Sequence, residues 1–362
     1  MKYSVIVPVF NRPDEVDELL DSLARQTNKD FEVVIVEDGS EVRCEDVVCK
    51  YADRLSVQYF EKPNSGPGQS RNFGAERSRG EYLIVLDSDV VLPEGYLAEV
   101  DRELTQKPCE AFGGPDRAHE SFSPVQKAIN YSMTSFFTTG GIRGGKKKLD
   151  KFYPRSFNMG IKKSLYEQLS GFSAMRFGED IDFSIRIFKS GARCRLFPEA
   201  WVWHKRRTDF RKFFRQVHNS GIARINLYKK YPESLKLVHL LPAVFTIGVA
   251  VLSAVFLTGV IFTLVGLYAG YFAASGCNMG LVLAFFGLAL MALALLPILL
   301  YSLLILIDSS VKNRSLWVGI LSIPASFIQL LGYGTGFLRT WWLRCILGRN
   351  EELQAFRKTF YK

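Results

Sequence analysis

The chain has 362 residues, a hydrophobic share of 48% and a formal net charge of +10 at pH 7. Its length allows two domains. Its six cysteines include no CxxC pair, which argues against structural zinc and for a reducing compartment. Residues 201–236 alone hold ten Lys and Arg against two acids, directly before a long apolar region. That placement favours anionic lipid headgroups, and not nucleic acid, as the partner of the basic residues.

The N-terminal sequence, MKYSVIVPVF, predicts a short buried strand and no signal peptide, because Pro8 interrupts the apolar run and no cleavage site follows. Apolar residues at helical spacing then predict a helix over Pro13–Gln26. Three more strands are predicted in the sequences FEVVIVEDGS, LSVQYF and YLIVLDSDV, with helix-like NFGAERS before the last one. Strands that alternate with helices predict an α/β domain with a mostly parallel central sheet.

Acidic side chains follow two of these strands. Asp87 and Asp89 are two residues apart and therefore point the same way from an extended chain. Asp38 ends the second strand. Because ligands bind outside the carboxyl ends of parallel strands, we expect one cleft that gathers these three acids around a nucleotide and a divalent cation. A turn with two solvated aspartates is the alternative for Asp87 and Asp89 taken alone.

Five segments in this order, VIVPVFNR, VEDGS, GPGQSRNFG, LDSDV and GED, resemble the family 2 glycosyltransferases over roughly residues 1–236. The resemblance implies the GT-A nucleotide-sugar fold. It also implies that Asp38 and Arg71 lie at the donor nucleobase and that Asp87 lies near the ribose. Pro8, in the loop Pro8–Arg12 at the same sheet edge, is a further expected donor-binding residue. Asp89 would be the direct ligand of Mn²⁺ or Mg²⁺. One departure is visible, because Glu37 replaces the first acid of the usual DDGS.

The resemblance makes Asp180, in GEDIDF, the general base. A carboxylate within hydrogen-bond reach of an acceptor hydroxyl can take its proton as the new bond forms. The alternative is that Glu179 and Asp180 only favour a helix N-terminus electrostatically. His204, in WVWHKRR, either completes the metal site as a neutral imidazole or is a packed side chain. Arg206 and Arg207 either pair with the donor diphosphate or extend toward lipid.

The C-terminal part predicts membrane-spanning helices. Leu240–Ile307 contains 68 residues without Asp, Glu, Lys or Arg, and Leu316–Leu338 adds 23. A helix needs about 20 apolar residues to cross a bilayer. We favour four helices, with breaks near Thr258–Gly259 and at Gly276–Gly280, and three remain the alternative if the last segment is re-entrant. An even number of spans keeps the basic C-terminal tail in the cytoplasm with the N-terminal domain.

These features predict four regions. Residues 1–207 form a cytoplasmic catalytic domain, and 208–236 form a basic amphipathic helix in the lipid headgroups. Residues 237–338 form the transmembrane region and 339–362 the basic tail. A helix packed on protein is the alternative for 208–236. Gln216 starts the QxxRW pattern of processive family members, but neither Arg nor Trp follows at the required spacing.

The predicted function is inverting, metal-dependent transfer of a sugar at the bacterial-type cytoplasmic membrane. A nucleotide-sugar, with a UDP-sugar favoured, is the expected donor, and a lipid-linked or envelope glycan is the expected acceptor. A processive polysaccharide synthase, a polyprenyl-phosphate glycosyltransferase and a catalytically silent GT-A membrane scaffold are the alternatives. Four acids in one predicted cleft argue against the scaffold. The sequence contains no GxxxxGK[ST] loop, which argues against a nucleotide-driven transporter.

Overall fold

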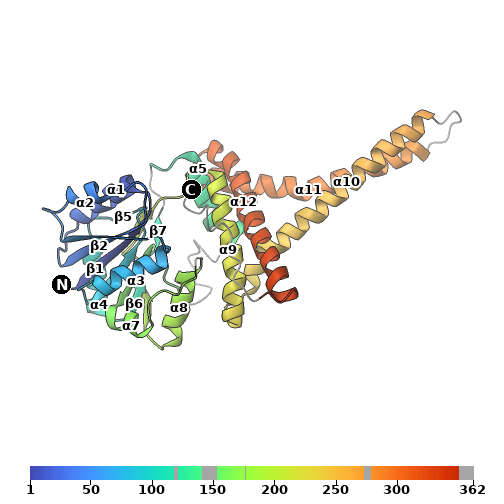
Figure 1. Cartoon of the computed structure of the whole chain (residues 1–362). Coiled ribbons are helices and arrows are strands. Elements are labelled where there is room, and N and C mark those ends of the chain that lie inside the picture. The colour runs from blue at the N-terminus through green and yellow to red at the C-terminus, as the bar shows by residue number, and fades with distance from the viewer. Residues whose placement is uncertain (118–120, 141–152, 176, 273–278, 350–362) are drawn as a thin grey trace. The chain divides into compact units, whose positions relative to one another are not determined.

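The computed structural model forms two compact units (Figure 1). Among the described residues, the first combines 1–122 with 153–206, and the second combines 123–140 with 207–349. The sequence predicts one domain over residues 1–207, whereas the structure groups residues 123–140 with the second unit. The structure describes residues 1–117, 121–140, 153–175, 177–272 and 279–349.

A seven-stranded sheet in the order β3-β2-β1-β4-β8-β6-β9 forms the centre of the first unit. Neighbouring strands among β1 to β4 are parallel, β8 is antiparallel to β4 and to β6, and β6 is parallel to β9. The expected mostly parallel sheet is therefore confirmed, and the strand before Asp87 is central and fully buried. The strands are β1 (Tyr3–Val9), β2 (Phe31–Asp38), β3 (Val57–Lys62), β4 (Tyr82–Leu86), β6 (Ala111–Gly113), β8 (Asn158–Lys162) and β9 (Cys194–Leu196).

Helices cover both faces of this sheet, because side chains of successive strand residues point to opposite faces. In β4, Ile84 and Leu86 belong to one apolar core, whereas Leu83 and Val85 belong to the other. The first core also takes side chains from α1 (Pro13–Ala24), α2 (Glu45–Cys49) and α4 (Tyr96–Gln106). The second takes them from α3 (Pro67–Arg77), α7 (Lys163–Gln168) and α8 (Glu179–Lys189).

A small second sheet brings the end of the first unit next to the LDSDV turn. It has the order β5-β10-β7, formed by β5 (Val90–Val91), β10 (Val202–His204) and β7 (Asp116–Arg117). In the antiparallel pair of β10 with β5, His204 lies opposite Val90. Asp89 directly precedes β5, and its carbonyl oxygen accepts a hydrogen bond from the Lys205 backbone nitrogen at 3.0 Å. Sheet pairing therefore places His204 beside Asp89.

Gly160 lets an aromatic ring lie flat across β8. It pairs with Phe112 on β6 and with Ile84 on β4 in regular register. A Cβ atom on Gly160 would lie 1.9 Å from Cζ of Phe112. The Phe112 ring is stacked on Phe197 with centroids 4.5 Å apart, so it is held from its other side. The position therefore requires a residue without a side chain.

We predict that Gly160→Ala lowers the free energy of unfolding by about 1–3 kcal/mol, because the new methyl group overpacks the core against Phe112. Equilibrium unfolding in urea of the detergent-solubilised chain measures this change. In a Phe112→Ala background, which itself costs about 3–5 kcal/mol, the effect of Gly160→Ala should be close to zero. An equal cost in both backgrounds would disprove the contact.

Within the part of the chain that the structure describes, the second unit has three helices long and apolar enough to cross a membrane, judged by length and composition alone. They are α10 (Leu241–Phe272), α11 (Met279–Asn313) and α12 (Leu316–Trp341). The sequence favours four helices and the described residues contain three, because α10 continues through Thr258–Gly259 without a break. The reason differs from the alternative of a re-entrant last segment, since α12 is one continuous helix. A Cβ on Gly259 would lie 2.6 Å from the carbonyl oxygen of Gly287, so this glycine serves close packing. The second expected break, Gly276–Gly280, lies partly outside the described residues.

Helix α9 (Phe210–Lys230) begins after Asp209, whose carboxylate accepts a hydrogen bond from the Lys212 backbone nitrogen at 2.7 Å. Its apolar residues Phe213 and Val217 are buried in a cluster with side chains of α5 (Pro124–Thr134). The apolar side of α9 therefore packs on protein, which is the alternative given above for residues 208–236. The unit also contains α6 (Phe136–Thr139), η1 (Pro232–Ser234), η2 (Leu237–Leu240) and η3 (Trp342–Ile346).

The expected basic tail differs from the structure in its first residues. Arg339 lies in α12 and Arg344 in η3, so residues up to Ile346 continue the helix. The remainder of the expected tail, from residue 350 on, lies outside the described residues.

Candidate active site

Hydrogen bonds and an ion pair connect the three loops at the carboxyl ends of β1, β2 and β4. Asn11, at a φ of +53°, donates from its backbone nitrogen to the Ser40 hydroxyl at 2.8 Å. Its side-chain oxygen accepts hydrogen bonds from the backbone nitrogens of Glu41 and Val42. The guanidinium of the next residue, Arg12, lies 3.3 Å from Asp89. The loops after these strands therefore meet at one edge of the sheet, as predicted.

Asp87, Asp89 and His204 form a group of potential metal ligands. One ligand atom from each lies within 4.8 Å of the others. The Nε2 atom of His204 is 3.2 Å from the Asp89 carboxylate, and the ring stacks on Phe157 with centroids 4.8 Å apart. The imidazole is therefore held in place from one side while its nitrogen faces the carboxylate.

This donor set fits a divalent cation. Two carboxylates and an imidazole supply oxygen and nitrogen donors, and a cation between them would offset the closeness of Asp87 and Asp89. The Nδ1 atom of His204 is buried without a hydrogen bond and lies 4.0 Å from Asp116. This separation is too long for a hydrogen bond, but the Asp116 carboxylate favours a proton on Nδ1 electrostatically, which would leave Nε2 as the metal-binding nitrogen.

Arg71 connects the candidate metal site to the start of α8. The guanidinium is 3% exposed and donates to Asp87 at 2.7 Å and to Glu179 at 3.0 Å. It also lies over the ring of Phe172 at 5.2 Å from the centroid. Only the Oδ1 atom of Asp87 is engaged by Arg71, so Oδ2 is the atom that a cation or a ribose hydroxyl would meet. The expected place of Arg71 at the nucleobase stays a prediction.

Glu179 is an acid that the sequence reasoning named only as a helix-end charge. Burial, and then the neighbouring carboxylate of Asp180, raise the pKa of Glu179 from 4.5 to about 7, against the opposing effect of Arg71. The ion pair with Arg71 is therefore only about half formed near pH 7 and becomes complete above it. This gives the buried group a charge that changes near physiological pH.

Asp180 follows directly and lies in the first turn of α8. Its Oδ2 atom is 2.7 Å from Nε of Arg155, and its Oδ1 atom accepts a hydrogen bond from the Ile181 backbone nitrogen at 2.8 Å. The carboxylate is therefore oriented by one side chain and one backbone group.

Asp38 holds the beginning of α3. It is 2% exposed, and its carboxylate accepts hydrogen bonds from Lys62 at 2.6 Å and from the backbone nitrogens of Ser65 and Gly66 at 2.9 Å each. A carboxylate at a helix N-terminus is electrostatically favourable. Asp38 therefore positions the helix that carries Arg71, and a direct contact with the nucleobase stays a prediction.

The other predicted residues are distributed as follows. Pro8 lies in β1, half-buried and opposite Val36 of β2. Arg206 is 8% exposed and paired with Asp116, so its charge is already balanced within the first unit. Arg207 belongs to the second unit. The donor-binding roles of all three stay predictions.

Glu37 has a structural role that explains the departure from the DDGS pattern. Its carboxylate is fully buried and accepts hydrogen bonds from the Ser40 hydroxyl, the Cys44 backbone nitrogen at 2.9 Å and the Tyr59 hydroxyl at 3.3 Å. Burial and the Glu37 carboxylate raise the pKa of Tyr59 and of the Cys44 thiol. The longer side chain therefore reaches partners on the inner side of the loop.

Sequence reasoning missed three site residues: Arg12, Lys62 and Arg155. Arg12 stands inside the quoted VIVPVFNR segment, so the motif contained a signal for it. Lys62 lies directly opposite Asp38 in the parallel pair of β2 and β3, which a register argument would have found. No sequence pattern pointed to Arg155.

We predict a pH-dependent stability difference between the native chain and Glu179→Gln. The folded chain keeps the Glu179 proton to higher pH than the unfolded chain, so ionisation destabilises the fold as the pH rises from about 4.5 to about 7. The stability of the native chain should therefore fall relative to Glu179→Gln over this interval, by an amount on the order of 3 kcal/mol. Thermal unfolding of detergent-solubilised protein between pH 5 and 7.5 measures it.

Glu167→Gln on α7 is the matched control, because the Glu167 side chain is 64% exposed. Its stability difference from the native chain should not change with pH. If the Glu179→Gln difference is also constant, Glu179 does not have a raised pKa.

The chain is similar to known glycosyltransferases. The family model described as Glycosyl transferase family 2 matches residues 4–170. An uncharacterized glycosyltransferase of Haemophilus influenzae is 31% identical over 194 residues, which are 51% of this chain and 62% of that protein. The poly(ribitol-phosphate) beta-N-acetylglucosaminyltransferase TarS of Staphylococcus aureus is 41% identical over 93 residues, 25% of this chain and 16% of that one. The chain thus spans less than two thirds of the length of these curated relatives.

A solved structure supports the fold. The mannosyltransferase PcManGT from Pyrobaculum calidifontis, described in complex with GDP-mannose and Mn²⁺, matches 86% of this chain and 87% of its own. The TM-score is 0.53 and the sequence identity 20%. Residues 4–170 are therefore similar to the family 2 glycosyltransferases, and the structural similarity shows a fold of the GT-A type.

Proposed function

We propose that this chain catalyses inverting, metal-dependent transfer of a sugar from a nucleotide-sugar to an acceptor hydroxyl. The observation that carries the proposal is the cluster of Asp87, Asp89 and His204, with ligand atoms within 4.8 Å of one another. Arg71 links this cluster through Glu179 to Asp180. A cation-binding group and a carboxylate base are the two aids that such a reaction needs.

Asp89 and His204 would hold the cation, with the Oδ2 atom of Asp87 as a further ligand. The bound cation would supply Lewis-acid stabilisation of the departing diphosphate. An imidazole in the ligand set favours Mn²⁺ over Mg²⁺, because Mg²⁺ prefers oxygen donors alone. We therefore propose Mn²⁺ as the better cofactor.

Asp180 would accept the proton of the acceptor hydroxyl. The acceptor oxygen then bonds to the anomeric carbon while the bond from that carbon to the diphosphate oxygen breaks. Attack from the face opposite the leaving group inverts the anomeric configuration, as in inverting glycosidases. Arg155, paired with Asp180 at 2.7 Å, would orient the carboxylate before substrate arrives.

For the substrates, we propose a UDP-sugar donor and a lipid-linked or envelope glycan acceptor. TarS, which is related over 93 residues, acts by its name on poly(ribitol-phosphate), an acceptor of the envelope type. The three apolar helices support association with membrane lipids. A catalytic unit on the cytoplasmic side of the inner membrane would meet both a soluble donor and a membrane-bound acceptor. A polyprenyl phosphate is the simplest lipid acceptor to test beside a glycan.

Nucleotide release from UDP-, GDP- and dTDP-sugars tests the reaction class without knowledge of the acceptor. We expect slow release from one donor class with Mn²⁺, less with Mg²⁺ and none with EDTA. Release that is equal in EDTA would contradict metal dependence. Absence of both release and metal-dependent nucleotide binding would instead support the membrane scaffold.

Two substitutions separate donor binding from proton transfer. Asp89→Asn should abolish Mn²⁺-dependent donor binding, measured by calorimetry. Asp180→Asn should preserve donor binding and lower turnover about 10²–10⁴-fold, which is the usual contribution of a general base. Asp53→Asn, an exposed aspartate of the same unit, is the matched control and should change neither quantity. Full activity of both site variants would show that the residue assignment is wrong.

A further inference from the structure

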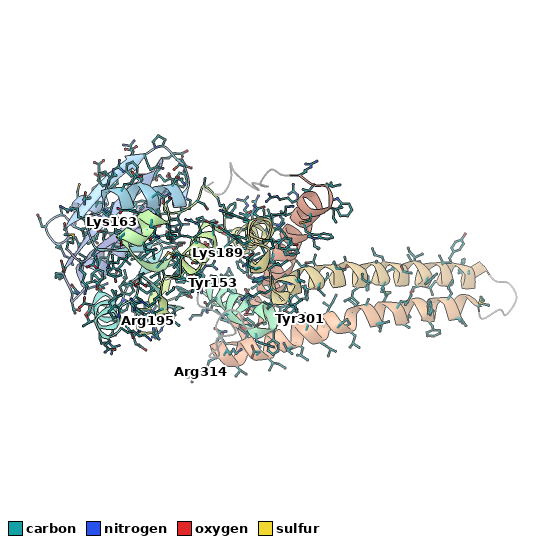
Figure 2. All side chains as sticks on the ribbon, turned by 90° about the horizontal axis from the view of Figure 1, so that it is seen from below. Tyr153, Lys163, Lys189, Arg195, Tyr301 and Arg314 are labelled. Atoms are coloured by element: carbon teal, nitrogen blue, oxygen red, sulfur yellow. The ribbon has the colours of Figure 1, made fainter. Side chains whose placement is uncertain are left out.

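Helices α10 and α11 form a long apolar hairpin (Figures 1 and 2). The two helices approach closely, since a Cβ on Gly266 would lie 2.5 Å from the carbonyl oxygen of Gly280. Large apolar side chains point away from this contact, among them Leu264, 62% exposed, and Phe285, 68% exposed. The two helices are thus packed closely against each other, and their outward-facing surface is apolar.

Helix α12 contacts the hairpin at its base. Phe327 packs with Phe245 of α10 and Tyr301 of α11, with ring centroids 5.7 Å and 5.6 Å apart. Tyr301 is labelled in Figure 2 at this end of the hairpin. From there to Met279, α11 extends for roughly 22 residues, or about 33 Å at 1.5 Å per residue. This length matches the hydrocarbon core of a bilayer, about 30 Å.

Helix α9 lies beside much of α12. Val217 shares an apolar cluster with Ile328, and a Cβ on Gly221 would lie 2.2 Å from the Tyr333 carbonyl oxygen. Farther along, Arg344 donates to Asn226 at 2.6 Å. Residue numbers increase together in both helices along this contact. The two helices therefore run parallel from Ile328 to Arg344, and each depth along α12 has a segment of α9 next to it.

The composition of α9 is incompatible with the interior of a bilayer. It carries six basic residues in 21 positions, namely Arg211, Lys212, Arg215, Arg224, Lys229 and Lys230. Charged side chains at the bilayer centre are costly and rare. If α12 crossed the hydrocarbon core, these charges would be brought to the same depth. Burial also sets α12 apart, because 39% of its most apolar stretch is inside the unit, against 11% for each hairpin helix.

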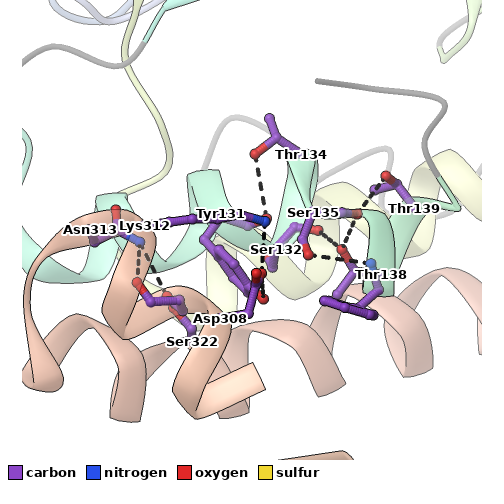
Figure 3. A network of polar contacts seen from close by, with 12 residues as sticks. Tyr131, Ser132, Thr134, Ser135, Thr138, Thr139, Asp308, Lys312, Asn313 and Ser322 are labelled. Carbon is purple, nitrogen blue, oxygen red and sulfur yellow. Dashed lines mark hydrogen bonds and ion pairs between the residues drawn. The ribbon is translucent and has the colours of Figure 1, made fainter. Parts of the chain in front are cut away.

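Polar groups also lie near the N-terminal half of α12. Ala128 of α5 packs with Val318 and Ala325 of α12. Figure 3 shows Tyr131 of the same helix beside Asp308, to which it donates a hydrogen bond at 2.6 Å. Lys312 pairs with the same carboxylate at 2.8 Å. An ion pair, Asp308 with Lys312, therefore lies at the C-terminal end of α11, next to the start of α12.

We propose that only α10 and α11 cross the bilayer, and that α12 lies with α5 and α9 in the headgroup region on the side where α10 enters. The partner of the hairpin surface is the acyl-chain layer, and the partner of the basic surface of α9 is anionic headgroups. The end of η3 is then on the same side of the membrane as α9. This inference rests on the proposed membrane association and adds its topology.

Cysteine labelling in intact bacterial cells tests the topology. Single cysteines at Met279, Arg349 and Lys212 are introduced into the full chain after its six native cysteines are replaced by serine. All three positions are exposed. With a membrane-impermeant maleimide, Met279→Cys should label in intact cells. Arg349→Cys should match Lys212→Cys on α9, with both labelling at least tenfold more after permeabilisation.

Labelling of Arg349→Cys together with Met279→Cys, and opposite to Lys212→Cys, would show that α12 spans and would overturn the proposal. Equal labelling at all three sites would overturn the spanning hairpin. Release of the native chain by alkaline carbonate would instead show that no segment of the chain spans the membrane and would also overturn the proposal. Because the cysteine-free chain can fail to fold, trypsin treatment of inverted vesicles with the native chain and a C-terminal tag provides a second measurement. Loss of the tag in inverted vesicles, with protection in right-side-out vesicles, is the expected result, and the reverse contradicts it.

Discussion

The buried guanidinium of Arg71 is the interaction on which the candidate site depends. It is 3% exposed and lies between carboxylates from two distant parts of the chain, Asp87 after β4 and Glu179 at the start of α8. A planar guanidinium can donate to two carboxylates at once, which a lysine ammonium does with less directional control. Without this cation, the carboxylates of Asp87 and Glu179 would lose the positive charge that offsets them both. Removing one partner of a buried ion pair is strongly destabilising for the same reason.

The same side chain sets the distance between the two halves of the proposed chemistry. One oxygen of Asp87 is held by Arg71, which leaves the other for the metal side, where Asp89 and His204 lie. Glu179 is directly followed by Asp180, the proposed base. Asp38 caps the start of α3 and so positions Arg71 itself. Arg71 on α3 thus connects the carboxylate of Asp87, beside the proposed metal ligands, to Glu179, the neighbour of the proposed base.

Much of the fold could be predicted from the sequence, because β4 and its neighbours are short apolar runs that end in acids and glycine. The position of the loops after β1, β2 and β4 at one sheet edge could also be predicted, because the carboxyl ends of parallel strands lie at the same edge. The partners of Arg71 and Asp180 could not be predicted, since they depend on which strands and helices pack together. His204 was left open because its place beside Asp89 results from pairing between β10 and β5, far apart in sequence. The unbroken α10 was missed because a glycine at position 259 indicates a turn or a close helix contact equally well.

The central claim is that Asp89 and His204 hold the catalytic cation. Pulsed electron paramagnetic resonance of the Mn²⁺-loaded protein tests it most directly, because a coordinated imidazole nitrogen modulates the electron-spin echo. We expect ¹⁴N modulation in the native chain, its loss in His204→Gln and its retention in His218→Gln, a histidine of the second unit. Mn²⁺ bound with oxygen ligands only in the native chain, or modulation that persists in His204→Gln, would contradict the site.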